Sequence, residues 1–222
     1  MRFRQFRIVE PEILDDQPPE QAALSLRDIV RINRLTGGHA VLCSTLRRLV
    51  GPDEHFSVLD IGAASGDAGV VIRRAFHRAR VFSLDYRHHH LRTAPPDRIV
   101  ADAFQLPFAP RSVDIVYCGM FLHHFENAAI VELLRCFGQI ARRFIIVNDL
   151  ERSILPYYFL PATRRVFGWH PITLHDGPVS VQASFKRSEI LELARRAGLD
   201  NIDARVHRPA FRVSMVASPP RC

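Results

Sequence analysis

The stretch VLDIGAASGDAG, residues 58–69, decides the fold. Its first half is a buried apolar run that ends in an acid and a glycine, which is typical of a strand entering a tight turn. Gly62 and Gly66 can adopt dihedral angles that other residues avoid, and they let the backbone approach a ligand closely. The following DAGVVIRRAFH predicts a helix, whose free N-terminal amides favour a polar or anionic group. The stretch therefore predicts a strand–turn–helix unit that binds a ligand.

Around this unit, short apolar runs alternate with amphipathic stretches. Strands are predicted at FSVLDIG, ARVFSLD, DRIVADA, SVDIVYCG and RRFIIVND, and two more near residues 200–206 and 211–217. One further helix covers AAIVELLRCFGQIA, capped by Asn127, and another covers KRSEILELARRAGL. Such alternation favours parallel strands joined by right-handed crossovers. The predicted fold class is therefore α/β, a doubly wound sheet whose ligands bind beyond the carboxyl ends of its strands.

Three aspartates mark the ends of three successive predicted strands. Asp60 lies at the end of the first strand, Asp85 ends the second, and Asp102 follows the third. In a parallel sheet these ends meet at one edge, so the three carboxylates line one crevice. A carboxylate at Asp85 can accept hydrogen bonds from ribose hydroxyls, and one at Asp102 can accept a hydrogen bond from an adenine amine. The glycine turn alone is compatible with NAD, FAD or S-adenosylmethionine. The three aspartates make the prediction more specific, because they favour a site for a nucleoside.

At these residues the sequence resembles the Rossmann-like (class I) S-adenosylmethionine-dependent methyltransferases of small molecules. VLDIGAASGD looks like the first motif of that family, SLDY like its acid motif, and DAFQLPFAPRSVDIVYCGMFLHHF like its third and fourth strand motifs. The resemblance implies S-adenosylmethionine as cofactor and a mostly parallel seven-stranded sheet, order 3-2-1-4-5-7-6, with the last strand antiparallel. NAD fits less well, because the middle glycine of G-x-G-x-x-G is missing. The residues that the resemblance assigns to the cofactor are Asp60, Gly62, Ala64, Gly66, Asp85, Tyr86, Asp102 and Ala103, with Ala64 standing where the family usually has glycine.

Two helical regions accompany this core. Residues 1–55 show helical apolar spacing with a break at Gly37-Gly38, which predicts an N-terminal cap of two short helices. The methyltransferase domain is expected at residues 56–222, with an insertion at 151–185 that reads as a helix plus a loop. This insertion is rich in aromatic residues and prolines. It is either a lid over a flat, apolar acceptor or a part of the core or of a homodimer contact.

Three histidines are candidate catalytic residues. An acceptor that carries a proton needs a base, and an imidazole, with an ordinary pKa of about 6.5, can take that proton near neutral pH. His123 and His124 follow the fourth predicted strand, and His175 lies in the insertion beside Asp176. For His123 and His124 the alternative is a role in packing or capping the following loop. The histidine run at residues 88–90 predicts an exposed turn, and no metal site is expected.

The composition limits the kinds of molecule that the protein is expected to bind. The 222 residues carry a net charge of +7, and the paired arginines lie where helices are expected, which indicates solvated surface more than nucleic-acid binding. No apolar run is long enough for a transmembrane segment. The cysteines predict neither a disulfide framework nor a zinc site, which suits the cytoplasm. They are Cys43, Cys118, Cys136 and Cys222.

Together these features predict an S-adenosylmethionine-dependent methyltransferase that methylates an oxygen of a phenolic or polyketide-like small molecule in secondary metabolism. The aromatic acceptor follows from a looser similarity of IVRINRLTGGHAVL and VNDLERS to a bacterial subgroup linked with polyketide pathways. The alternatives are methylation of a nucleic acid or a quinone-type lipid, and a non-catalytic S-adenosylmethionine-binding partner protein. Enzymes that methylate base amines often place N/D-P-P-Y/F after strand four, where this chain has CGMFLHHF.

Overall fold

The apolar run before the glycine turn forms β1 (Phe56–Ile61), an interior strand of a seven-stranded sheet. The computed structural model describes residues 2–220. The strand order is β3-β2-β1-β4-β5-β7-β6, and β7 runs antiparallel to both of its neighbours while β1 to β5 pair in parallel. The predicted fold class and strand order are thereby confirmed. The other strands are β2 (Ala79–Asp85), β3 (Arg98–Val100), β4 (Val113–Gly119), β5 (Ala141–Leu150), β6 (Asp200–His207) and β7 (Arg212–Ser218).

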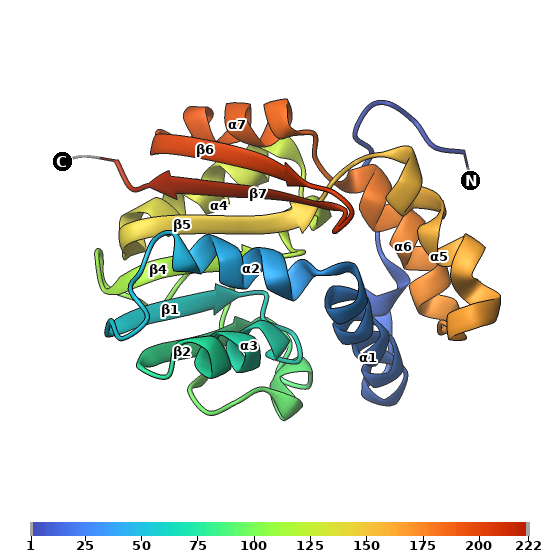
Figure 1. Ribbon diagram of the computed structural model, residues 1–222, viewed down its shortest axis with the longest axis horizontal. Coiled ribbons are helices and arrows are strands. Elements are labelled where there is room, and N and C mark those ends of the chain that lie inside the picture. The colour runs from blue at the N-terminus through green and yellow to red at the C-terminus, as the bar shows by residue number, and fades with distance from the viewer. Residues whose placement is uncertain (1, 221–222) are drawn as a thin grey trace.

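Amphipathic helices cover both faces of the sheet. Helices α2 (Gly38–Arg47) and α3 (Asp67–Ala75) lie on one face, and α4 (Asn127–Ile140) and α7 (Arg187–Arg196) lie on the other (Figure 1). Each face buries a cluster of apolar side chains, and this burial is the main favourable contribution to folding. The chain from residue 67 to 150 thus follows the right-handed strand–helix–strand pattern of a doubly wound sheet.

A second group of helices stands beyond the carboxyl ends of the parallel strands. Figure 1 shows α1 (Pro19–Thr36), α5 (Ile154–Phe167) and α6 (Pro171–Ala183) gathered at that edge. The two helices of the expected N-terminal cap therefore lie in different places. Helix α1 belongs to this group, whereas α2 packs on the sheet through Leu42 and Leu46. The two helices and the break between them match the sequence pattern. The domain boundary at residue 55 stays a prediction.

The insertion forms two helices, so the expectation of one helix and a loop was wrong. Gly177 and Pro178 favour a loop in the sequence, yet both lie inside α6. A Cβ atom at Gly177 would lie 2.3 Å from Leu160 Cδ1, which shows that this glycine permits α5 and α6 to pack closely. Burial of Ile172 and Val179 supports the helix further. Tertiary packing has overridden local propensity here.

Two local predictions also need correction. Asn127 is the first residue of α4 and not its N-cap, and its side chain accepts a hydrogen bond from Arg7 Nη1 at 2.9 Å. Within the run at residues 88–90, His88 is exposed but His90 is buried, and its Nδ1 lies 3.5 Å from Asp85 Oδ1. The contact of Asn127 with Arg7 joins residues that are distant in the sequence. The burial of His90 depends on its contact with Asp85 at the end of β2.

Arg7 holds the N-terminal segment against the rest of the protein. Its guanidinium donates to the carbonyl oxygens of Ala183, at 2.6 Å, and His123, at 3.2 Å, and also to that of Phe125. The same group lies over the Phe185 ring at 4.8 Å. Arg7 therefore joins this segment to the end of α6 and to the loop after β4.

A carboxylate of α6 holds the next part of the segment. Asp176 accepts hydrogen bonds from the backbone N–H groups of Ile13, at 3.0 Å, and Leu14, at 2.9 Å. These residues begin a 3₁₀ turn (Ile13–Asp16) that leads towards α1. Glu12, which directly precedes the turn, is thereby held in a buried position.

None of the helices in the described part of the chain combines the length and apolarity that crossing a membrane requires. Cys43, Cys118 and Cys136 are free thiols. Cys222 lies outside the described residues.

Replacing Arg7 by Ala removes the contacts that join the N-terminal segment to α6 and to the loop after β4. We expect the free energy of unfolding to fall by about 1.5–3 kcal/mol, since charged hydrogen bonds are lost. Hydrogen exchange of residues 2–14 is expected to rise. Arg4→Ala is the control, because the Arg4 side chain is exposed and lies over the Phe6 ring of the same segment. Equal exchange in the two variants would contradict the role given to Arg7.

Candidate functional site

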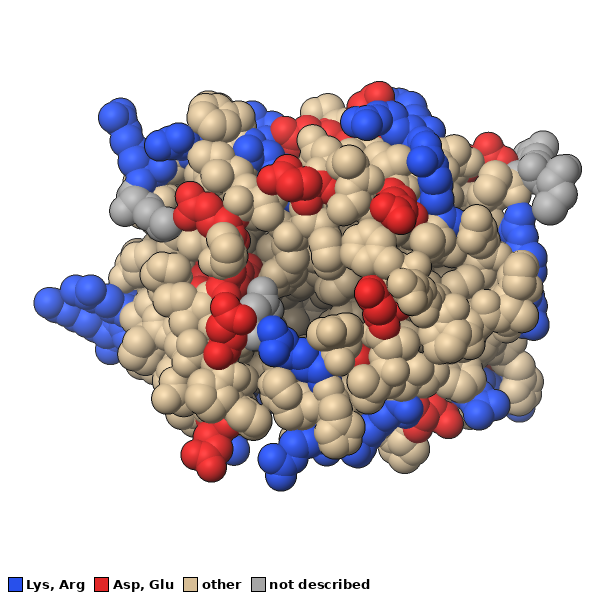
Figure 2. Space-filling model, turned by 180° about the vertical axis from the view of Figure 1, so that it is seen from behind, with Lys and Arg blue, Asp and Glu red and all other residues tan. Residues whose placement is uncertain are grey.

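A cavity of about 590 Å³ lies between the carboxyl ends of the strands and the helices α1, α5 and α6. Its volume is in the range of small-molecule sites. Figure 2 shows a hollow in the face opposite to that of Figure 1, with acidic side chains around it and most basic side chains nearer the outline of the molecule. The site is built by segments that the sheet topology brings together.

Two positions of the turn after β1 lie so close to neighbouring segments that a residue with a Cβ atom would clash there. Gly62 has φ of +66°, and a Cβ atom there would lie 2.4 Å from Phe121 Cδ2. Gly66 has φ of +73°, and its Cβ would lie 2.6 Å from Ala94 Cβ. Gly62 lines the cavity, whereas Gly66 packs against the loop after β2. Both positions therefore require glycine, but only Gly62 faces the cavity.

Asp85 ties this turn to the end of β2. Its carboxylate accepts the backbone N–H of Ala64 at 2.9 Å and that of Arg87 at 2.9 Å. Burial raises the pKa of Asp85, but hydrogen bonds from His90 and from these two N–H groups outweigh burial and hold the pKa below its ordinary value. Asp85 is thus a carboxylate at neutral pH, fixed at the edge of the cavity.

Asp60 lines the cavity with a buried side chain. The side chain is only 2% exposed, and its Oδ2 has no hydrogen-bond partner among the described residues. Burial raises the pKa of Asp60 well above its ordinary value, and the nearby charges of Asp67 and Asp85 raise it further. A ligand that brings a cationic group here satisfies that oxygen and offsets the gathered negative charge.

The remaining predicted cofactor residues lie along the same wall. Asp102 accepts the backbone N–H of Phe104 at 2.9 Å, Ala103 is buried, and Tyr86 is 73% exposed at the rim. All three line the cavity, as do Asp60, Gly62, Ala64 and Asp85. The structure therefore brings every predicted cofactor residue except Gly66 to one cavity.

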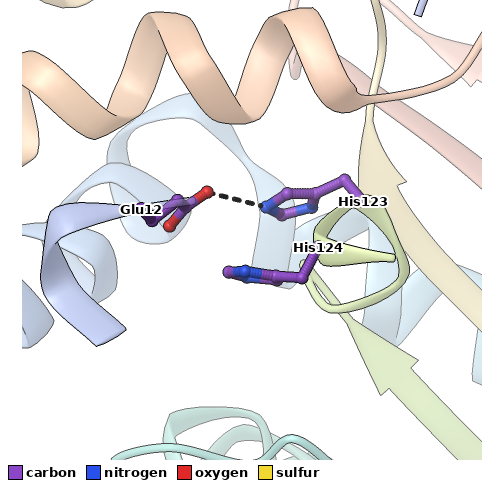
Figure 3. Close-up of side chains that lie close together, drawn as sticks. All are labelled: Glu12, His123 and His124. Atoms are coloured by element: carbon purple, nitrogen blue, oxygen red, sulfur yellow. Dashed lines mark ion pairs between the residues drawn. The ribbon is translucent and has the colours of Figure 1, made fainter. Parts of the chain in front are cut away.

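On the β4–β5 side of the cavity lies a buried polar group. His123 is 2% exposed, its Nδ1 lies 2.7 Å from Asp149 Oδ1, and its Nε2 lies 3.3 Å from Glu12 Oε1 (Figure 3). Burial lowers the pKa of His123, but Asp149 and Glu12 outweigh burial and raise it to about 10. Burial raises the pKa of Glu12, but His124, His123 and Ser180 lower it to about 2. At neutral pH His123 is therefore a cation between two carboxylates.

The other two histidine candidates differ in position. His124 is half-buried, lines the cavity and stacks on His123, with ring centroids 4.5 Å apart. His175 is exposed and does not line the cavity, and its Nδ1 lies 2.9 Å from Asp176 Oδ1. The structure thus brings His123 and His124 to the site but leaves His175 outside it.

Sequence reasoning missed Glu12 and Asp149. Asp149 lies near the end of β5, so the rule that found the other strand-end acids also applies to it. Glu12 carries no comparable signal, because its place depends on how the N-terminal segment folds over the site.

An apolar wall closes the cavity. Leu26 and Ile29 of α1 and Phe159 and Leu160 of α5 line it. Of the aromatic residues in the insertion, Phe159 lines this wall. Trp169, in the segment that joins α5 to α6, is buried and donates to Thr163 Oγ1 at 2.9 Å. The insertion thus contributes both to the cavity wall and to helix packing, and its role as a lid over an acceptor stays a prediction.

Comparisons with known proteins agree with this arrangement. Residues 59–142 match a family model described as a methyltransferase domain. No curated protein matches the chain by sequence.

Solved structures share the fold at low sequence identity. An S-adenosylmethionine-dependent methyltransferase from Aquifex aeolicus is 13% identical with a TM-score of 0.59, over 91% of this chain and 98% of that one. A candidate O-methyltransferase of Nostoc punctiforme is 20% identical with a TM-score of 0.59, over 80% of this chain and 55% of that one. Human N-acetylserotonin methyltransferase, in complex with S-adenosylmethionine, is 16% identical with a TM-score of 0.55, over 74% and 48%. The chain spans about half the length of the last two proteins.

The backbone of Ala64 yields a test of the turn. Its φ is +46°, in the left-handed region that costs a non-glycine residue about 1–2 kcal/mol. Ala64→Gly relieves this strain, whereas Ser65→Gly, one residue later, has none to relieve. Both variants gain similar freedom in the unfolded chain, so we expect Ala64→Gly to be more stable than Ser65→Gly by about 1–2 kcal/mol. Denaturant unfolding measures the difference, and the opposite order would contradict the strained turn.

Proposed function

We propose that this chain is a class I, Rossmann-like methyltransferase that uses S-adenosylmethionine, and that it methylates an oxygen atom of a small phenolic acceptor in a secondary-metabolite pathway. One observation carries the proposal. A single cavity joins the aspartates on the β3–β2–β1 side to the Glu12–His123–His124 group on the β4–β5 side. The first half suits a nucleoside, and the second half suits the removal of a proton.

The aspartate half fits S-adenosylmethionine. Its ammonium and sulfonium are cations, and the partnerless oxygen of Asp60 lies in a region made negative by Asp67 and Asp85. We assign Asp85 to the ribose hydroxyls and Asp102 with Ala103 to the adenine. When bound, the cofactor supplies the electrophilic methyl group. The residues of the chain hold it in line with the acceptor, and such positioning contributes on the order of 7–11 kcal/mol.

The other half suits an acceptor with a hydroxyl group. The wall formed by α1 and α5 is apolar, which matches a flat aromatic body. A phenol has a pKa of about 10, so its proton must be removed for efficient transfer. His123 is already protonated between Asp149 and Glu12. We therefore assign the proton transfer to His124, which lines the cavity.

The surface argues against a nucleic-acid acceptor. Nucleic-acid binding depends on basic side chains that neutralise phosphates. In Figure 2 acidic side chains lie on several sides of the hollow and one basic group borders it, while most of the other basic side chains lie nearer the outline of the molecule. A quinone-type lipid shares the hydroxyl and the apolar body, so it belongs in the same substrate panel as the phenols.

Asp85→Asn tests the cofactor assignment. The amide has one acceptor oxygen fewer and no charge, so calorimetry is expected to show S-adenosylmethionine binding weakened about tenfold or more. Asp53→Asn is the matched control, because Asp53 is exposed and outside the cavity. Equal affinities in the two variants would refute the assignment.

His124→Gln tests the proton-transfer assignment. We expect kcat for labelled-methyl transfer to a panel of phenols and quinols to fall by about 10²–10⁴-fold. The affinity for S-adenosylmethionine is expected to stay unchanged. His175→Asn, outside the cavity, is expected to retain the wild-type rate. A loss in His175→Asn with full activity in His124→Gln would reverse the assignment, and wild-type protein that transfers methyl to no member of the panel would refute the proposed acceptor class.

A further inference from the structure

The Glu12–His123–His124 group has the composition and spacing of a metal site. One ligand atom from each residue lies within 4.8 Å of those from the other two. Figure 3 shows the carboxylate of Glu12 facing both imidazole rings. Two histidines and one glutamate, with a further position open to a cavity, are a set that binds catalytic zinc.

Asp149 orients His123 as a metal-bound histidine is commonly oriented. A histidine ligand usually donates its second ring N–H to a carboxylate, which fixes the ring and its tautomer. Here Nδ1 of His123 faces Asp149 at 2.7 Å, while Nε2 points to Glu12. Asp149 is fully buried in β5 and also accepts the backbone N–H of Leu150 at 2.7 Å. The ring is therefore held with its free nitrogen towards the other two ligands.

Glu12 is held in place for the same role. It is 8% exposed and accepts a hydrogen bond from the Ser180 hydroxyl. The segment that carries it is fastened by Asp176 on one side and Arg7 on the other. On binding, a divalent cation displaces the Nε2 proton of His123, and together with the neutral imidazole ligands it balances the two buried negative charges of Glu12 and Asp149.

We propose that Glu12, His123 and His124 bind a divalent transition-metal ion whose remaining position faces the cavity. Imidazole nitrogens favour ions such as Zn²⁺ over Mg²⁺, which prefers oxygen ligands. Nothing in this step depends on the acceptor, so the site can be tested without it.

The role of the ion rests on the proposed function. An acceptor hydroxyl bound to the open position has a lowered pKa, as metal-bound water does, and its proton passes to water. The oxygen lone pair then forms the C–O bond while the C–S bond of the sulfonium breaks, and sulfur keeps that electron pair. In the metal-bound protein His124 is a ligand, and the ion takes over the task of removing the proton from the acceptor.

Calorimetry with Zn²⁺ on chelator-treated protein, without cofactor or acceptor, tests the site. We expect one tight site per chain, and Glu12→Gln and His124→Asn are expected to weaken it about tenfold or more. Glu10→Gln and His55→Gln are the matched controls, because both side chains are exposed and lie outside the cluster. Far-UV circular dichroism checks that each variant is folded. The visible spectrum of Co²⁺-loaded protein reports the ligand set directly.

The outcomes separate the two proposals. Absence of tight Zn²⁺ binding, or binding that Glu12→Gln and His124→Asn leave unchanged, would overturn the metal site. A metal-loaded protein that methylates no phenol or quinol keeps the site and refutes the O-methylation. Full transfer activity after chelation, with metal loss verified, would overturn the role of the ion in transfer.

Discussion

The hydrogen bond from the backbone N–H of Ala64 to Asp85 is the constraint on which the site depends. It fixes the turn after β1 against the end of β2, and it requires a left-handed backbone at a residue that is not glycine. The turn also positions the loop after β4, because the Phe121 ring occupies the space that a side chain at Gly62 would need. Phe121 also contacts Phe125, with ring centroids 5.0 Å apart. His123 and His124, which lie between these two phenylalanines in the sequence, are thus positioned by the same turn that shapes the aspartate side of the cavity.

The second half of the site depends on segments that lie far apart along the chain. Glu12 reaches His123 because the N-terminal segment is fastened by Arg7 and Asp176, and the apolar wall exists because α5 and α6 pack together over the sheet edge. In the proposed function, the sheet supplies the cofactor half of the cavity, and the added helices and the N-terminal segment supply the acceptor half. This division explains how a fold with many acceptors can keep one cofactor site while its surrounding helices change.

The sequence is informative where local pattern and sheet topology act together. Asp60, Asp85 and Asp102 could be placed at one edge because parallel strands bring their carboxyl ends together, and the cavity contains all three. Asp149 follows the same rule and was overlooked. By contrast, α6 could not be predicted through Gly177 and Pro178, because the helix exists by virtue of its packing against α5.

Contacts between side chains that are distant in the sequence could not be predicted either. The exclusion of His175 from the cavity depends on which face α6 turns inward. The pairing of His123 with Glu12 and Asp149 joins three separate segments, and no spacing in the sequence indicates it. The burial of His90 beside Asp85 has the same origin, since it arises from the fold of the loop after β2.

A crystal structure with S-adenosylhomocysteine bound is the most direct measurement. The ribose hydroxyls should lie within hydrogen-bonding distance of Asp85, the adenine beside Asp102 and Ala103, and the sulfur towards the Glu12–His123–His124 group. A nucleoside bound outside the cavity, or one whose sulfur points away from these three side chains, would contradict this description of the site.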